Sequence, residues 1–133
     1  NQVRDSLPNR AYALSRPKIL DQLDSKYLNN VQLAYPEDFH SDPSSTKIQK
    51  FESDFRKKYR SLPDRFAYRG FDVTFDMLYS LAQNSNLEVG ILDNNHRLMQ
   101  GRFNYTRQPI GGYFNRGVLL LRYHNWKLID ISE

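Results

Sequence analysis

The residues best suited to metal binding or acid–base chemistry are the three histidines, His40, His96 and His124. A zinc site on a helix usually places a second ligand three or four residues from the first. None of the histidines has such a partner, and the chain has no cysteine to supply a thiolate ligand, a nucleophile or a disulfide. We therefore expect each histidine at the surface or in a turn, and no metal site.

Patterns typical of catalysis are also sparse. No Gly-x-Ser-x-Gly segment is available to expose a serine nucleophile. The pair Gly111-Gly112 precedes a strand-like stretch, so it predicts a hairpin loop with positive φ rather than a phosphate-binding loop. The carboxylate pairs Glu37-Asp38 and Asp72-Asp76 would support acid–base chemistry only with separated pKa values, and nothing in the sequence indicates such a separation. The sequence therefore predicts a protein that is not an enzyme and needs no cofactor.

Length and composition are those of an ordinary globular chain. The 133 residues suffice for one domain or for part of a larger one. The hydrophobic share of 39% and the charged share of 26% are typical of soluble proteins. No apolar run approaches the ~20 residues that cross a bilayer. Because the chain opens on Asn1 without an initiating methionine, we expect a segment of a longer protein.

The net charge of +4 is concentrated in residues 96–133. Arginines and lysines there outnumber Asp130 and Glu133, and aromatic residues lie between them. This pattern leaves open an alternative in which the basic tail binds nucleic acid. The positive residues are nevertheless too widely spaced for a surface that follows a phosphate backbone. We therefore predict solvent-facing positions on strands, and no nucleic-acid partner.

The first part of the chain alternates between strand and helix patterns. Residues 1–9 favour the end of a helix, and residues 11–14 a brief strand. Apolar residues at helical spacing predict a helix over 18–28, followed by a strand over 31–35 that ends at Pro36. This strand–helix–strand order predicts a crossover unit and a parallel sheet.

Two longer helices are predicted next. Asp42-Pro43 is typical of a helix start, and the helix that follows buries one stripe made of Ile48, Phe51, Phe55 and Tyr59. Asp64 is expected to cap a second helix over residues 66–83. That helix is apolar on most of its circumference, so we expect it to be sandwiched between a sheet and another layer. Its mid-helix glycine, Gly70, is explained by close packing.

The rest of the chain is predominantly β. The pattern is weak over residues 84–100, although a short apolar run occupies 87–92. Strands are expected over 102–107 and 117–123. His124-Asn125 predicts a tight turn before a last strand over 126–131.

Several of these features occur in a recognisable order. They are the strand Val31-Gln32-Leu33-Ala34-Tyr35 with Pro36, the spaced aromatics Phe51, Phe55 and Tyr59, then Pro63, then Ala67-Tyr68-Arg69-Gly70-Phe71-Asp72. The segment from Tyr27 to Ala82 thereby resembles the closing part of the type I periplasmic-binding fold, the family of branched-chain amino-acid receptors. The tail, with Gly101–Tyr105, Gly111–Asn115 and Leu121–Tyr123, resembles the final β-segment of a branch found in envelope proteins, some of which carry peptidoglycan-binding LysM modules.

The resemblance implies a partial fold of that family, namely a parallel-sheet α/β lobe segment followed by a C-terminal antiparallel β-segment. Residues 1–62 would form a second-lobe-like segment, and residues 63–133 the helix and terminal strands of the crossing and first lobe. Complete domains of this fold clamp a small ligand between two lobes. Because most ligand contacts come from earlier segments, the ligand-binding residues of this chain stay unknown. Arg69 and Asp72 match a helix in which the Gly-(Tyr/Phe)-Asp unit mainly fixes packing.

The implied function is a non-enzymatic solute-binding or receptor-like domain, similar to those of ABC transporters. The resemblance places it in a cell-envelope protein or lipoprotein, in the periplasm or at the outer membrane of a Gram-negative bacterium. Its ligand would be small and polar, such as an amino acid or a cell-wall fragment. An interaction or regulatory module for peptidoglycan synthesis, without a small ligand but with an envelope protein partner, stays open as an alternative. As a fragment, the chain would expose apolar surface at the helix over 66–83 and at the terminal strands, and it would pair with a second copy.

Overall fold

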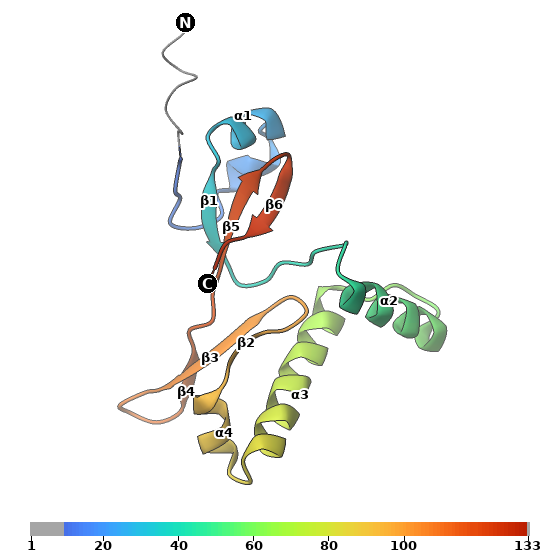
Figure 1. Cartoon of the computed structure of the whole chain (residues 1–133), viewed down its shortest axis with the longest axis vertical. Helices are drawn as coiled ribbons and strands as arrows, with labels where there is room; N and C mark the ends of the chain where they lie inside the picture. The colour runs from blue at the N-terminus through green and yellow to red at the C-terminus, as the bar shows by residue number, and fades with distance from the viewer. Residues whose placement is uncertain (1–9, 133) are drawn as a thin grey trace, which may run out of the picture. The chain divides into compact units, whose positions relative to one another are not determined.

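The computed structural model describes residues 10–132, which form two compact units (Figure 1). The first unit comprises the described residues up to Glu37 and those from Leu119 onward, and the second comprises Asp38–Val118. Both units contain helices and strands, so the mixed α/β class is confirmed. The helix end expected within residues 1–9 lies outside the described residues. The boundary expected at residue 62 concerns the lobes of a longer protein and stays a prediction.

The first unit is built on a three-stranded antiparallel sheet with the order β1-β5-β6. Tyr35 on β1 lies opposite Leu121 on β5, and Leu121 lies opposite Asp130 on β6. Its core is formed by buried side chains of the sheet and two short helices, namely Leu20, Leu28, Tyr35, Leu119 and Leu121. The elements are the 3₁₀ helix η2 (Lys18–Asp21), α1 (Ser25–Asn30), β1 (Ala34–Glu37), β5 (Leu119–His124) and β6 (Lys127–Asp130).

The predicted crossover is present in reduced form. Tyr12 makes one isolated parallel bridge to Ala34. The strands of both sheets in the described residues pair antiparallel, so the predicted parallel sheet is wrong. The helix expected over residues 18–28 is divided into η2 and α1, because Asp24 accepts a hydrogen bond from the Lys26 amide and caps a new helix. β1 also continues past Pro36, which was expected to end it. An edge strand tolerates a residue that lacks an N–H donor.

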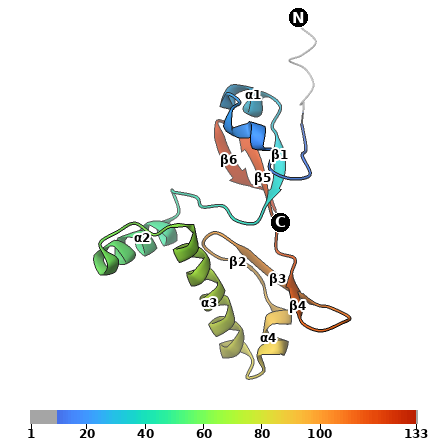
Figure 2. The ribbon, with the colours of Figure 1, turned by 180° about the vertical axis from the view of Figure 1, so that it is seen from behind.

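The second unit contains three helices and a three-stranded antiparallel sheet with the order β2-β3-β4. Figures 1 and 2 both show the β2–β3 hairpin lying alongside α3. The elements are α2 (Thr46–Tyr59), α3 (Arg65–Gln83), α4 (Leu87–Asp93), β2 (Asn95–Arg97), β3 (Arg102–Arg107) and β4 (Tyr113–Asn115). The short helix α4 occupies the apolar run for which the sequence pattern indicated no element.

Helix α2 begins three residues later than expected. Asp42 does not cap it; its carboxylate accepts a hydrogen bond from the Ser44 amide at 2.9 Å and forms a local turn instead. The predicted buried stripe is confirmed in part: Ile48 is buried, whereas Tyr59 is 55% exposed. The ring centroid of Phe51 lies 5.1 Å from that of Tyr68 and 5.0 Å from that of Phe71 on α3. These contacts join α2 to the first half of α3.

Helix α3 has the predicted cap but the opposite buried face. The Asp64 carboxylate accepts a hydrogen bond from the Ala67 amide at 2.8 Å. The buried positions, however, follow a four-residue spacing and are mostly polar: Tyr68, Asp72, Asp76 and Ser80. The polar side chains of this face bond to the β2–β3 hairpin and to their own helix. The expected sandwich of an apolar helix between two layers is therefore wrong for the described residues.

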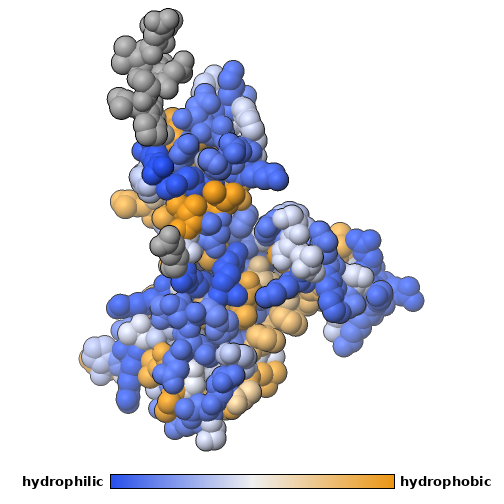
Figure 3. All heavy atoms as spheres, in the orientation of Figure 1, coloured by the Kyte–Doolittle hydropathy of each residue, from blue (hydrophilic) through white to orange (hydrophobic). Residues whose placement is uncertain are grey.

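The apolar side of α3 is largely exposed. Phe71, Phe75 and Leu78 keep 41%, 44% and 61% of their surface accessible. Figure 3 shows apolar atoms gathered along this helix. Large exposed apolar patches on a globular protein usually mark an interaction surface or a face that another element covers.

The sequence predicted close packing at Gly70, but the structure shows it at other glycines. A Cβ atom on Gly70 would meet no atom within 4 Å, so the close-packing explanation of this glycine is wrong. A Cβ atom on Gly90 would instead lie 2.4 Å from the carbonyl oxygen of Ser80. Glycine is therefore required where α4 crosses the end of α3.

The C-terminal strands match the prediction with small shifts. The strand over 102–107 is confirmed as β3, and the loop after it contains Gly111 and Gly112 with φ of 67° and 79°. β4 was not anticipated, and the last turn lies at Asn125 and Trp126, one residue later than predicted. No helix in residues 10–132 has the length and apolar character needed to cross a membrane.

Candidate functional site

A small pocket lies beside the N-terminal end of α3. Its cavity volume is about 100 Å³, which is small beside the roughly 300–1,000 Å³ of drug-sized ligand sites. Three parts of the second unit line it: the segment just before α2, the first turns of α3 and the β2–β3 loop. The lining residues are Asp38, Phe39, Arg65, Phe66, Arg69 and Gln100.

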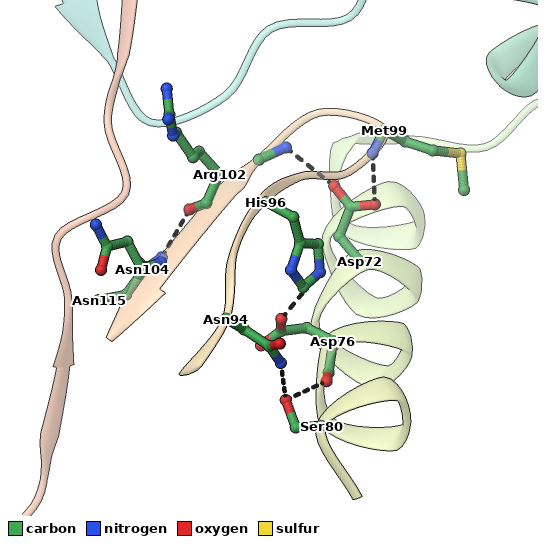
Figure 4. A network of polar contacts seen from close by, with 10 residues as sticks. Asp72, Asp76, Ser80, Asn94, His96, Met99, Arg102, Asn104 and Asn115 are labelled. Carbon is green, nitrogen blue, oxygen red and sulfur yellow. Dashed lines mark hydrogen bonds and ion pairs between the residues drawn. The ribbon is translucent and has the colours of Figure 1, made fainter. Parts of the chain in front are cut away.

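Asp72 fixes the loop that forms one wall of the pocket. Its buried carboxylate accepts hydrogen bonds from three consecutive backbone amides, those of Met99 at 3.0 Å, Gln100 at 2.8 Å and Gly101 at 3.0 Å. Figure 4 shows this side chain reaching from α3 to the loop. On the other side of the loop, the carbonyl of Gln100 accepts a hydrogen bond from the His40 amide at 2.9 Å. The backbone of Gln100 is therefore held from two directions.

Two arginines on the first turns of α3 give the pocket a positive wall. The guanidinium of Arg65 lies 5.0 Å from the ring centroid of Phe39 and 5.4 Å from that of Phe66. The guanidinium of Arg69 lies 6.0 Å from the ring centroid of Phe103. Within the described part of the chain, neither guanidinium has a carboxylate or hydrogen-bond partner. Aromatic faces attract these cations without neutralising their charge.

Gln100 adds a polar group to the pocket. The residue is only 7% exposed, and its side-chain amide has no hydrogen-bond partner among residues 10–132. The amide nitrogen and oxygen are not among the buried atoms without a partner, so this amide keeps contact with solvent and is free to bond to a ligand. Asp38, also on the wall, makes no ion pair with any described residue. The pocket thus offers two cations, one carboxylate and one amide.

A second polar cluster lies further along α3. Asp76 is fully buried, and its Oδ1 lies 3.3 Å from Nε2 of His96 on β2. The Ser80 hydroxyl donates to the carbonyl of Asp76 at 2.8 Å and accepts from the Asn94 amide at 2.5 Å (Figure 4). Because that hydroxyl hydrogen is already used, Ser80 is not placed to act as a nucleophile activated by His96. The cluster therefore joins α3 to β2 and does not form a catalytic triad.

Burial dominates the electrostatics of this cluster. It raises the pKa of the Asp76 carboxyl above its ordinary value of 3.8, and the nearby Asp72 adds to the rise. The nearby His96 and a hydrogen bond from Tyr105 act in the opposite direction and lower the pKa of Asp76. Burial and the nearby Asp76 raise the pKa of Tyr105 to about 12.

These shifts predict a pH dependence that the Asp76→Asn variant removes. A raised folded pKa gives stability that is fully present below pH 3.8 and is lost as the pH rises through the folded pKa. Each unit of the rise corresponds to about 1.4 kcal/mol. Relative to the wild type, Asp76→Asn should therefore become more stable as the pH rises from about 4 through the raised folded pKa of Asp76. Urea unfolding midpoints measured over this range test the prediction, and parallel curves for the two proteins would contradict it.

The structure places the residues singled out from the sequence in different roles. His96 lies 26% exposed beside Asp76 instead of at the surface or in a turn, whereas His124 ends β5 beside the last turn. Arg69 and Asp72 are close together on α3 but have different roles. Arg69 lines the pocket, and Asp72 bonds to the β2–β3 loop. The pocket residues Phe39, Arg65 and Gln100 were not predicted. The four-residue spacing of Arg65 and Arg69 was the one signal available in the sequence.

No model of a known protein family matches this chain, and no curated protein matches it. Two solved structures are similar to it. One is an ABC transporter substrate-binding protein from Desulfitobacterium hafniense in complex with Leu, with 18% identity over 75% of this chain and 31% of that chain, at a TM-score of 0.47. The other is an ABC transporter substrate-binding protein from the same organism, with 19% identity over 74% of this chain and 31% of that chain, at a TM-score of 0.45. The chain thus spans about a third of either structure's length.

Proposed function

We propose that this chain belongs to a non-enzymatic ligand-binding domain of the solute-binding type in a cell-envelope protein. The observation that supports binding is the pocket beside α3, where, among the described residues, Arg65 and Arg69 lack carboxylate partners and the side-chain amide of Gln100 lacks a hydrogen-bond partner. These groups recognise a polar or negatively charged ligand, and none of them is a nucleophile. The envelope setting, in the periplasm or at the outer membrane, follows from the sequence resemblance.

A second candidate function is supported by the exposed apolar face of α3. Phe71, Phe75 and Leu78 lie along one side of the helix and remain accessible. An interaction module would use such a face to bind an envelope protein partner or a second copy of the chain. Under this alternative, which includes a regulatory role in peptidoglycan synthesis, a small ligand would not be needed.

An NMR titration of the isotope-labelled chain with amino acids and soluble cell-wall fragments distinguishes the two functions. Solute binding predicts saturable shifts of a localised set of backbone amides. A chain that responds to no solute but sediments as a dimer would contradict the first proposal and support the second. The sedimentation experiment uses the same sample over a range of protein concentrations.

A further inference from the structure

We propose that the Arg65–Arg69 pocket binds a small monocarboxylate anion. This inference rests on the proposed ligand-binding function and names the chemistry of its ligand. A carboxylate matches the planar fork of N–H donors on a guanidinium, and such charge-assisted bonds are the strong ones in proteins. Arg65 and Arg69 are four residues apart, so they project from neighbouring turns of the same side of α3.

Aromatic rings lie beside both guanidiniums, and both arginines are exposed to solvent. Arg65 lies over the rings of Phe39 and Phe66, and Arg69 over that of Phe103. Nη1 of Arg69 would lie 3.6 Å from a Cβ atom placed on Gly101, so this guanidinium lies close to the β2–β3 loop. A guanidinium beside an aromatic ring keeps N–H groups available for an anion.

The charge of the pocket favours a monoanion. Two arginines and Asp38 leave one net positive charge, which a single carboxylate neutralises. A phosphate dianion would exceed that charge and would lie in the same small space as the Asp38 carboxylate. Like charges at such short range repel each other. The structure therefore favours a carboxylate over inorganic phosphate, although both have the oxygen geometry that arginine recognises.

Gln100 supplies the third donor. Its backbone is fixed by Asp72 on one side and His40 on the other. Its amide nitrogen can therefore donate to a carboxylate oxygen without a large rearrangement of the loop. The cavity volume of about 100 Å³ suits acetate or propionate, or the carboxylate end of a larger molecule. The chemical class is thus a short monocarboxylate held by two arginines and one amide.

The experiment is an NMR titration of the full chain with sodium acetate and sodium propionate, compared with inorganic phosphate and chloride at constant ionic strength. Acetate should shift the amides of Arg65, Phe66 and Gln100 with saturation, and phosphate should bind at least about tenfold more weakly. Arg69→Gln should weaken acetate binding by about tenfold or more, because a hydrogen bond to a charged group is worth about 1.5–3 kcal/mol. Arg69→Lys keeps the positive charge but loses the planar fork of N–H donors. Its acetate affinity should lie between those of the wild type and Arg69→Gln.

Arg56→Gln is the matched control, since it removes one positive charge from α2 and Arg56 does not line the pocket. It should leave acetate affinity within about twofold of the wild type, because an exposed charge outside the site acts only through screened, long-range attraction. Equal responses to acetate, phosphate and chloride, or equal losses in Arg69→Gln and Arg56→Gln, would overturn the monocarboxylate site. If an amino acid or cell-wall fragment binds while acetate does not, only this inference fails. If nothing binds, the proposed function fails with it.

Discussion

Replacing Asp72 by alanine is expected to destabilise the second unit by about 3 kcal/mol, the cost of leaving several buried amides without an acceptor. The wild-type carboxylate is fully buried and accepts hydrogen bonds from Met99, Gln100 and Gly101. Alanine removes all three bonds, and no described side chain replaces them. The β2–β3 loop, and with it one wall of the pocket, should then open far more often.

Two measurements test this expectation. Hydrogen exchange of the three loop amides should accelerate by about a hundredfold, and the urea midpoint of the second unit should fall. Asp72→Asn should also be damaging, because its amide nitrogen would face a backbone N–H donor and repel it. Asp93→Ala is the control, since Asp93 is exposed at the end of α4. Unchanged exchange at Gln100 in Asp72→Ala would show that the carboxylate does not hold the loop.

Local sequence patterns predicted the helices, caps and turns of this chain better than the contacts that these elements make with one another. The Asp64 cap, the aromatic stripe of α2 and the positive φ of Gly111 and Gly112 are local properties, determined by a few neighbouring residues. The crossover between residues 11–14 and 31–35 was also predictable, because a strand–helix–strand order favours parallel pairing.

Burial on α3 was mispredicted because hydrophobicity alone decided which face was inside. Asp72 and Asp76 are tolerated in the interior through partners that lie 20 or more residues away on the hairpin. A single sequence carries no sign of such distant bonds. Phe75 and Leu78, which the sequence pattern predicted to be buried, are exposed. They would be buried only if a second layer packed on this side of the helix.

The pocket was missed for the same physical reason. Phe39, Arg65 and Gln100 are far apart in the sequence, and they meet only because Asp72 places the loop beside the start of α3. Each residue has an ordinary local role: one lies in a polar segment, one opens a helix and one follows a short strand. Their shared chemistry appears only when the three segments are assembled.

Gly117→Ala is expected to be the other large destabilising change, at about 3 kcal/mol or more. A Cβ atom at this position would lie 2.1 Å from the carbonyl oxygen of Arg102 and 2.9 Å from the backbone nitrogen of Phe103. These are backbone atoms of β3, which cannot rotate away as a side chain would. The contact can be relieved only by separating residues 115–117 from β3.

That separation would break a dense set of hydrogen bonds. The Asn115 side chain accepts from the amides of Asn104 at 2.8 Å and Gly117 at 2.9 Å, and donates to the carbonyl of Arg102 at 3.0 Å. Figure 4 shows the hydrogen bond at the Arg102 carbonyl. Because alanine at position 117 strains all of these bonds at once, the loss should exceed that of an ordinary overpacked side chain.

Gly70→Ala is the matched comparison, because it adds the same methyl group at a glycine with no atom within 4 Å. Alanine is favoured over glycine within a helix by about 1 kcal/mol, so Gly70→Ala should raise the urea midpoint while Gly117→Ala lowers it. Thermal and urea unfolding of both variants measure the two signs side by side. A Gly117→Ala protein as stable as the wild type would show that β3 and residues 115–117 do not approach as closely as the structure describes. A destabilised Gly70→Ala protein would instead indicate that another surface packs against α3 at that residue in solution.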